Sequence, residues 1–129
     1  MMRARKEISV DMAGCPVRNV LDRMSDRWAV LILRELAASK SLRFTVLKRA
    51  IGDISQRVLA QTLRRLEQDG YVSRTVYPTI PPRVDYALTP LGQSLWKCVT
   101  PLIAWAHANQ KQVKTARAAY VPPPALIAL

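Results

Sequence analysis

Residues 54–70 read ISQRVLAQTLRRLEQDG, and this stretch decides the fold. Its apolar residues recur every three or four positions, as they do along one face of an α-helix. Ser55 is a suitable N-cap, because its hydroxyl can accept a hydrogen bond from a free N–H of the first turn. Gly70 suits the position after the helix end, since glycine adopts the left-handed conformation that closes a helix. We therefore expect one amphipathic helix over residues 55–69. Its apolar stripe comprises Val58, Leu59, Thr62, Leu63 and Leu66.

The opposite face of this helix carries arginine and glutamine and has no acid at its centre. One interpretation is an ordinary solvated face, because both residue types are good helix formers. The other is a face that enters the DNA major groove, where Arg can bond a guanine edge and Gln an adenine edge. This stretch alone leaves both open. The centre of the face comprises Arg57, Ala60, Gln61, Arg64 and Gln68.

The composition indicates one folded domain with a polyanionic partner. The chain has 129 residues, 50% of them hydrophobic, and a net charge of +11. A pI near 10.5 favours binding to nucleic acid or to an anionic surface. There is no apolar run long enough to span a bilayer and no apolar segment after the basic N-terminus, so we expect a cytoplasmic protein with no membrane partner.

The positive charge is concentrated around the opening stretch. Residues 40–83 hold nine basic and three acidic side chains, a net charge of +6. Residues 1–39 hold seven basic and five acidic side chains, a net charge of only +2. This asymmetry favours the DNA interpretation of the helix at 55–69.

The segments before that helix predict three further helices. Cys15-Pro16 precedes a short amphipathic helix over 16–24, since proline is well tolerated in a first turn. Residues 27–38 are apolar nearly all round, which indicates a central buried helix capped by Ser25-Asp26. Residues 39–42 are expected to form a turn, and 43–51 a short helix.

The short helix over 43–51, the glycine-containing turn at 52–54 and the helix at 55–69 form a helix-turn-helix pattern. In that geometry the second helix reads DNA and the first crosses the backbone. We expect Trp28, on the buried helix before them, to lie in the core.

The period then changes from helical to two. Residues 71–77 and 84–88 alternate between apolar and polar positions and predict the two strands of a β-hairpin, with a proline-rich tip at 78–82. A helix-turn-helix followed by such a hairpin is a winged helix. Arg74 and Arg83 are candidates for contact with phosphates or the minor groove, or else they are solvated charges that protect a strand edge.

The C-terminal part has an apolar helical pattern over residues 89–109, which Pro101 is expected to kink or split. A small winged helix does not need this surface for its own core. We interpret it, with the helix at 16–24, as a homodimer surface; the alternative is that it packs back on its own domain. The predicted organisation is a basic N-terminal tail (1–14), a winged helix-turn-helix domain (15–109) and a C-terminal tail (110–129).

The order and spacing of these motifs resemble the HxlR-type winged helix-turn-helix regulators, relatives of the MarR regulators. The resemblance covers about residues 15–106, and it implies a mainly α fold with a small β-hairpin. It also implies a homodimer that binds double-stranded operator DNA to repress or activate genes. The matching segments are Cys15-Pro16-Val17, Arg27-Trp28, Val30-Leu31-Ile32-Leu33, Leu36, Arg43-Phe44, Leu47, Ile54-Ser55, Val58-Leu59, Leu63-Arg64-Arg65-Leu66, Asp69-Gly70, Arg74, Pro81-Pro82-Arg83-Val84, Tyr86, Leu88-Thr89-Pro90-Leu91-Gly92 and Trp105.

The resemblance also gives Cys15 a role, because in several members of this family a cysteine before proline near the N-terminus senses oxidants or electrophiles. A thiol at a helix N-terminus is a better nucleophile than an ordinary one. The alternative is that Cys15 is a small buried hydrophobic residue. Cys98 lies in an apolar stretch, and we interpret it as a packing residue.

We predict a sequence-specific DNA-binding transcriptional regulator without catalytic activity, metal or cofactor, and leave the identity of any small-molecule effector open. His107 is the only histidine and there is no Cys-x-x-Cys, which argues against a zinc site or a His-based active site. The alternative function is a winged-helix protein-interaction module. The recognition-helix candidates are Ser55, Gln56, Arg57, Gln61 and Arg64, facing base edges and adjacent phosphates. The candidates for the DNA backbone and the wing are Arg43, Lys48, Arg65, Arg74 and Arg83.

Overall fold

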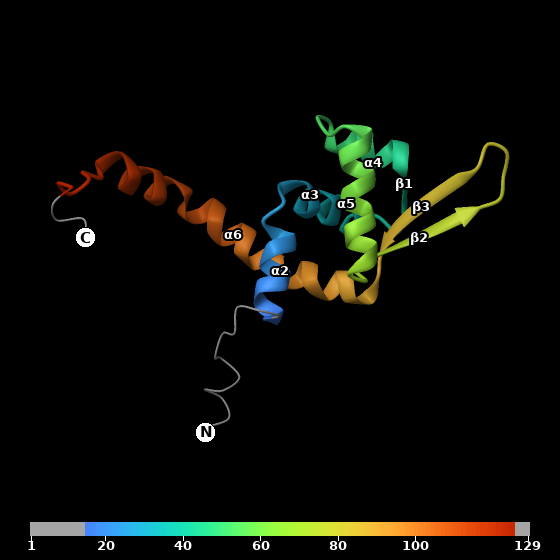
Figure 1. Ribbon diagram of the computed structural model, residues 1–129, viewed down its shortest axis with the longest axis horizontal. Coiled ribbons are helices and arrows are strands. Elements are labelled where there is room, and N and C mark those ends of the chain that lie inside the picture. The colour runs from blue at the N-terminus through green and yellow to red at the C-terminus, as the bar shows by residue number, and fades with distance from the viewer. Residues whose placement is uncertain (1–14, 126–129) are drawn as a thin grey trace, which may run out of the picture. The chain divides into compact units, whose positions relative to one another are not determined.

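The computed structural model describes residues 15–125, and the ribbon is shown in Figure 1. The predicted tail at 1–14 and the last four residues of the chain lie outside the described residues. The described chain has two compact units, one ending at Ser94 and the other beginning at Leu95. The elements, in order, are α2 (Pro16–Met24), α3 (Arg27–Ala37), β1 (Leu42–Arg43), α4 (Phe44–Ile51), α5 (Gln56–Gln68), β2 (Val72–Tyr77), β3 (Arg83–Leu88) and α6 (Pro90–Ala119).

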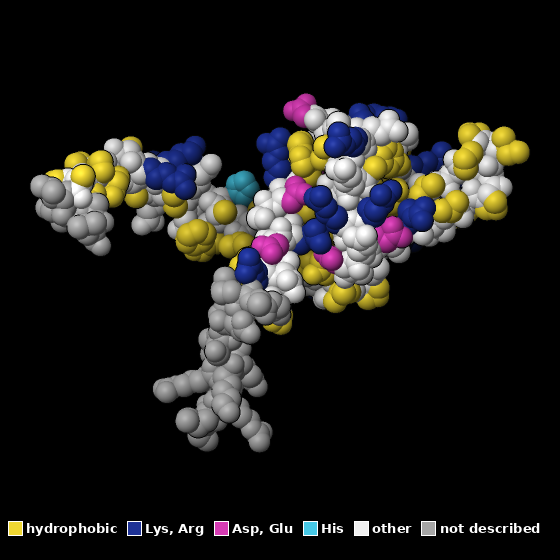
Figure 2. Space-filling model, viewed as in Figure 1, with side chains coloured by type: hydrophobic (Ala, Val, Ile, Leu, Met, Phe, Trp, Pro, Cys, Tyr) yellow, Lys and Arg dark blue, Asp and Glu magenta, His cyan; other side chains and the backbone are white. Residues whose placement is uncertain are grey.

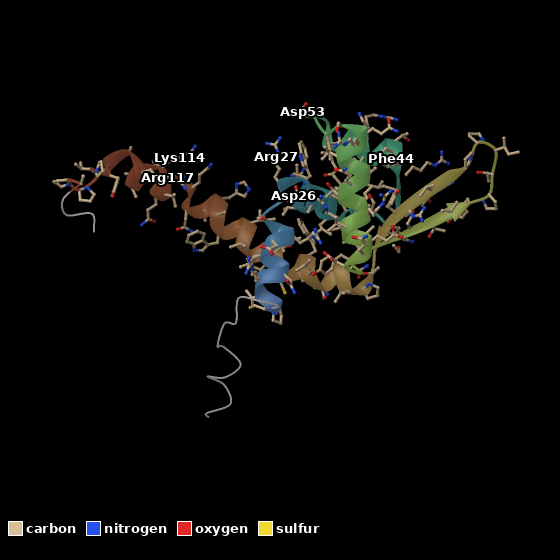
Figure 3. All side chains as sticks on the ribbon, in the orientation of Figure 1. Asp26, Arg27, Phe44, Asp53, Lys114 and Arg117 are labelled. Carbon is tan, nitrogen blue, oxygen red and sulfur yellow. The ribbon has the colours of Figure 1, made fainter. Side chains whose placement is uncertain are left out.

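The first two helices begin where the sequence predicts. Cys15 is the N-cap of α2, and Pro16 occupies its first position. Asp26 caps α3, because its carboxylate accepts a hydrogen bond of 2.9 Å from the backbone N–H of Trp28. The predicted burial of α3 is confirmed, but Trp28 itself is only half-buried and lies beneath the Arg27 guanidinium, 4.3 Å from the ring centroid. Figure 3 labels Asp26 and Arg27 at the start of this helix.

The predicted helix-turn-helix is confirmed as α4, a short turn and α5. Gly52 in the turn has a φ of +94°, which side-chain-bearing residues rarely adopt, and Ile54 anchors the turn in the core. The leucines of α3, α4 and α5 meet in one apolar centre, which fixes the angle at which α5 leaves the turn. The largest fully buried side chains are Ile32, Leu33, Leu36, Leu47, Leu59, Leu63, Leu66 and Val72.

The wing is part of a three-stranded antiparallel sheet in the order β1-β3-β2. The predicted hairpin of β2 and β3 is confirmed. The prediction that residues 39–42 form a turn and that a helix begins at residue 43 was wrong for residues 42 and 43. Leu42 and Arg43 form β1 and pair with Tyr86 and Asp85 of β3. Two residues are too few to show an alternating pattern, so this strand has no periodic signal of its own.

A tight joint connects the end of α5, the start of β2 and the first turn of α6. The Thr89 hydroxyl donates to the backbone carbonyl of Gly70 at 2.6 Å and accepts from the N–H of Gly92 at 3.0 Å. A Cβ on Gly92 would lie 2.1 Å from the carbonyl oxygen of Tyr71, so this position requires glycine. The joint ties the wing and α5 to one point of the backbone.

The long helix α6 runs through Pro101 without interruption and continues to Ala119. The predicted split at Pro101 and the predicted helix end at residue 109 were therefore wrong, because α6 is continuous to Ala119. Pro101 removes the donor to the carbonyl of Lys97, but both residues are exposed, so water can hydrate that carbonyl. Among residues 15–125, no helix is both long and apolar enough to cross a membrane.

Candidate nucleic-acid interface

The start of α5 is fixed by its cap. The Ser55 hydroxyl accepts a hydrogen bond of 3.1 Å from the N–H of Val58, as the sequence predicts. At the other end Gly70 has a φ of +83°, and the N–H of Tyr71 donates to the carbonyl of Leu66 at 3.0 Å. Both ends of α5 are therefore closed, and the helix presents a defined outer face.

The outer face of α5 points to solvent. Arg57, Gln61 and Arg64 are exposed, whereas Leu59, Thr62, Leu63 and Leu66 are buried on the inner side. Thr62 is tolerated there because its hydroxyl donates to the carbonyl of Val58 at 2.8 Å. Figure 2 shows Lys and Arg side chains gathered over α5 on the face turned to the viewer. The exposed residues of this helix are Gln56, Arg57, Gln61, Arg64, Arg65 and Gln68.

The two arginines at the centre of this face are available to a ligand. Of the described carboxylates, none lies within ion-pair distance of Arg57 or Arg64. Arg43, at the N-terminus of α4, is also exposed, while Lys48 on the same helix is half-buried. Exposed and unpaired guanidinium groups are suited to phosphates and guanine edges.

The two wing arginines have a different environment. Arg83 donates two hydrogen bonds of 2.9 Å to the carboxylate of Asp85, and its guanidinium lies 5.2 Å from the ring centroid of Tyr77. Arg74 lies 3.5 Å from the carboxylate of Glu67. The two arginines that were predicted to contact DNA from the wing are therefore each paired with an acid of the same unit. The pairing of Arg83 was not predicted, although the spacing Arg83-x-Asp85 on one strand places both side chains on the same face.

The contact between Arg83 and Asp85 also shifts the pKa of each of the two side chains. The hydrogen bonds from Arg83 lower the pKa of the Asp85 carboxyl below its ordinary value, and Arg43 on the neighbouring strand adds a smaller effect in the same direction. The hydrogen bond to Asp85 raises the pKa of the Arg83 guanidinium. The pair thus remains ionised and closed at neutral pH.

A small hollow of about 190 Å³ lies between α5 and the wing, and Ala60 and Arg64 of α5 line it. Its other walls are the Glu67–Arg74 pair and Tyr86. Burial raises the pKa of the Tyr86 phenol, and its ring lies 6.4 Å from that of Phe44, which Figure 3 labels at the start of α4. Arg64 therefore belongs to the border between helix and wing, while Arg57 lies nearer the helix N-terminus.

The helix α2 is linked to the end of α5 by an ion pair that the sequence did not reveal. Arg23 donates to both carboxylate oxygens of Asp69, the C-cap residue of α5, with the longer bond at 3.2 Å. The hydrogen bond to Asp69 raises the pKa of Arg23. Residues 46 positions apart carry no local pattern that would predict such a contact.

The two cysteines differ in exposure. Cys15, predicted as a redox sensor, is buried at the N-cap of α2, and its backbone carbonyl accepts from the N–H of Asn19 at 3.1 Å. Cys98 is exposed on α6, so its interpretation as a packing residue was wrong. Within residues 15–125, no three His, Cys, Asp or Glu side chains are grouped as a metal site.

Comparisons with known proteins agree with this geometry. A family model described as HxlR-like helix-turn-helix matches residues 23–114. The chain is 43% identical over 112 residues to the uncharacterized HTH-type transcriptional regulator YtfH of Escherichia coli (strain K12), covering 87% of this chain and 88% of that protein.

Two solved structures are similar in fold and sequence. One is described as a transcriptional regulator, ytfH from Salmonella typhimurium, with a TM-score of 0.73 and 42% identity, covering 85% of this chain and 97% of that one. The other is the redox regulator HypR in its reduced form, with a TM-score of 0.71 and 33% identity, covering 78% and 98%. These identities support a similarity in function class as well as in fold.

Proposed function

We propose that this chain, which belongs to the HxlR-like helix-turn-helix family of transcriptional regulators, binds a specific DNA operator as a homodimer. The outward, unpaired cationic face of α5 is the observation that carries this proposal. In helix-turn-helix proteins the N-terminal part of the second helix contacts base edges in the major groove. We assign base contacts to Gln56, Arg57 and Gln61, which occupy that part of α5.

The remaining cations fit contacts to the DNA backbone. Arg64 and Arg65 lie in the second half of α5, and Arg43 and Lys48 lie on α4, the helix that crosses the backbone in this geometry. Ser55 caps α5 with its hydroxyl and is a positioning residue in this arrangement. Such contacts set affinity and register without carrying sequence information themselves.

Exposed apolar side chains support the homodimer. On α2, Val17 and Leu21 are 63% and 59% exposed; on the second unit, Leu102 and Trp105 of α6 are 64% and 60% exposed. Large exposed apolar groups gathered on two helices are typical of a protein interface. A two-fold dimer would place its recognition helices about 34–36 Å apart, one turn of B-DNA, on a pseudo-palindromic operator.

Selection of bound duplexes from a random pool, with the full chain, tests the proposal. The expected product is an inverted repeat whose half-site centres are about 10 base pairs apart. Sedimentation of the protein alone should give a dimer. A pool that shows no enriched sequence after several rounds would contradict specific DNA binding.

Reversing the charge of two arginines on α5 distinguishes DNA binding from the alternative function, a protein-interaction module. The double variant Arg57→Glu with Arg64→Glu should lose the selected operator, because two phosphate- or base-facing cations become anions. The matched control, Lys40→Glu with Lys111→Glu, makes the same change in net charge at exposed positions outside α5. Equal operator affinity for both double variants would favour the rival function.

We propose Cys15 as a redox switch that controls DNA binding. HypR, which is similar to this chain, is a redox regulator, and Cys15 occupies the N-cap of α2. A quinone adds its electrophilic ring carbon to the thiol sulfur while the thiol proton passes to the ring oxygen. Because Cys15 is buried at the N-cap of α2, we expect an adduct of this size to displace the start of that helix. Quinone should release wild type and Cys98→Ser from DNA but not Cys15→Ser. Release of Cys15→Ser as readily as wild type would disprove the role.

A further inference from the structure

The helix α2 is weakly anchored in the core. None of its nine residues is buried, and it carries Val17 and Leu21, two of the exposed apolar side chains assigned above to the homodimer. By contrast, α5 is fixed to its unit by Leu59, Leu63 and Leu66, which are fully buried. A helix without buried side chains gains little from packing, so its position depends on the few specific contacts that it makes.

One of these contacts reaches the end of α5. Arg23, in the last turn of α2, donates from two guanidinium nitrogens to the two carboxylate oxygens of Asp69, with the longer bond at 3.2 Å. The two side chains are 28% and 30% exposed, so water screens this pair less than a fully exposed one. A bidentate contact between arginine and carboxylate fixes orientation as well as distance. The pair therefore ties α2 to the C-terminal end of α5 in one orientation.

The chemistry of this helix end indicates that Asp69 is not there to stabilise α5 itself. Asp69 is the C-cap residue, and the free carbonyl groups at a helix C-terminus carry a partial negative charge that disfavours a carboxylate. The arginine that offsets this repulsion lies on α2. The pair borders a hollow of about 360 Å³, lined by Asn19, Asp22, Arg23, Asp69 and Tyr71. Polar contacts, rather than close apolar packing, join the two helices at this point.

The length of α5 converts a small change at this end into a larger displacement at the other. The helix has 13 residues, which corresponds to about 20 Å. Gln56, Arg57 and Gln61, assigned above to base edges, lie in the half far from Asp69. A rotation of about 10° at the Asp69 end would move the first turn of α5 by about 3.4 Å, the rise of one base pair. The contact at the C-cap therefore bears on which base pairs the helix can reach.

We propose that Arg23 and Asp69 are positioning residues that set the half-site spacing accepted by the homodimer. The inference rests on the operator binding proposed above and assigns the spacing specificity of that function to two residues outside the DNA-contacting face. Through their contact, the position of the dimer surface on α2 is carried to α5 within the same unit. Without the contact, α5 remains packed on its leucines and reads a half-site, but the two reading helices lose their fixed separation.

The experiment measures the affinity of the full chain for three duplexes by fluorescence anisotropy. One is the selected operator, and the other two lengthen or shorten the distance between its half-sites by one base pair. Wild type should bind the altered duplexes about tenfold more weakly than the selected one, an effect comparable to one mismatched base pair. Arg23→Gln and Asp69→Asn should each reduce this ratio to about twofold, and the double variant should reduce it no further, because all three remove the same contact.

The matched control is Arg34→Gln, which removes the same charge from α3, where the carboxylate partner is the adjacent Glu35. This variant should keep the wild-type ratio. A loss of folded protein lowers the apparent affinity for all three duplexes alike, so the ratio reports the spacing preference and not the stability of the fold.

Wild-type ratios for both Arg23→Gln and Asp69→Asn would overturn the inference while leaving the proposed function standing. Loss of the dimer by these variants in sedimentation would also overturn it, because the pair would then be needed for association itself. A wild-type chain that binds no duplex would overturn both proposals.

Discussion

Arg57 on α5 and Arg83 on β3 are both exposed arginines of the same compact unit, yet they are prepared for different partners. Arg57 has no carboxylate of the described residues within ion-pair distance, whereas Arg83 is held by two hydrogen bonds to Asp85. A count of basic residues treats them as equal. The charge that a binding surface offers therefore depends on which of its cations lack an internal acid.

The largest effect should come from the joint that holds the two regions together. Gly92→Ala would place a Cβ 2.1 Å from the carbonyl oxygen of Tyr71, and backbone cannot yield as a side chain can. We expect a loss of about 3 kcal/mol in the free energy of unfolding, measured by urea titration. The comparison variant is Gly70→Ala, whose Cβ would meet only Leu91 at 3.6 Å. It should lose about 1 kcal/mol from its positive φ alone. Equal losses would show that the joint is soft.

The next test compares the salt dependence of the two regions directly. Arg64→Gln removes a cation that, like Arg57, has no described carboxylate within ion-pair distance and that we assign to the DNA backbone. The steepness of log K against log salt should therefore decrease by about 0.9, with a lower affinity at every salt concentration. The double substitution Arg83→Gln with Asp85→Asn removes a cation and its anion together, leaving the net charge unchanged. Its slope should equal that of wild type. A shallower slope for the double variant would mean that Arg83 leaves Asp85 when DNA binds.

A smaller effect concerns pH. Since Arg83 lowers the pKa of Asp85 in the folded protein below the ordinary value of 3.8, the pair stabilises the fold above about pH 4. That stability is lost as pH falls through the lowered pKa. Urea midpoints measured from pH 7 to 2.5 should therefore converge for wild type and Asp85→Asn at the acid end. Asp53→Asn, in the exposed turn before α5, is the control and should follow wild type throughout. Parallel curves for wild type and Asp85→Asn would contradict the lowered pKa.

The sequence predicted those features that depend on neighbouring residues. The cap at Ser55, the glycine after α5, the strands of the wing and the resemblance to HxlR-type regulators were all predicted from local patterns and are confirmed. Periodicity, caps and turn residues are local signals, which is why they can be read without coordinates.

The sequence could not show which distant side chains meet. Glu67 pairs with Arg74, and Arg23 pairs with Asp69, through contacts that depend on how the helices and the sheet pack. The strand β1 exists only because β3 offers it a partner. Pro101 was predicted to interrupt the C-terminal helix, but its exposed position allows α6 to continue through it. The assignment of individual residues to DNA remains a prediction for the experiments above.

The smallest expected effect comes from a substitution that converts a paired arginine into an unpaired one. It tests most directly whether paired and unpaired arginines differ in their contribution to DNA binding. Glu67→Gln should free Arg74, whose distance to the Glu67 carboxylate is 3.5 Å, and tighten operator binding about threefold at low salt. The control, Glu35→Gln, removes the same negative charge from α3, where its partner is Arg34. Affinities measured side by side should rise more for Glu67→Gln, and its salt slope should steepen. Equal tightening by both variants would mean that only net charge matters, and the distinction between free and paired arginines would then fail at the wing.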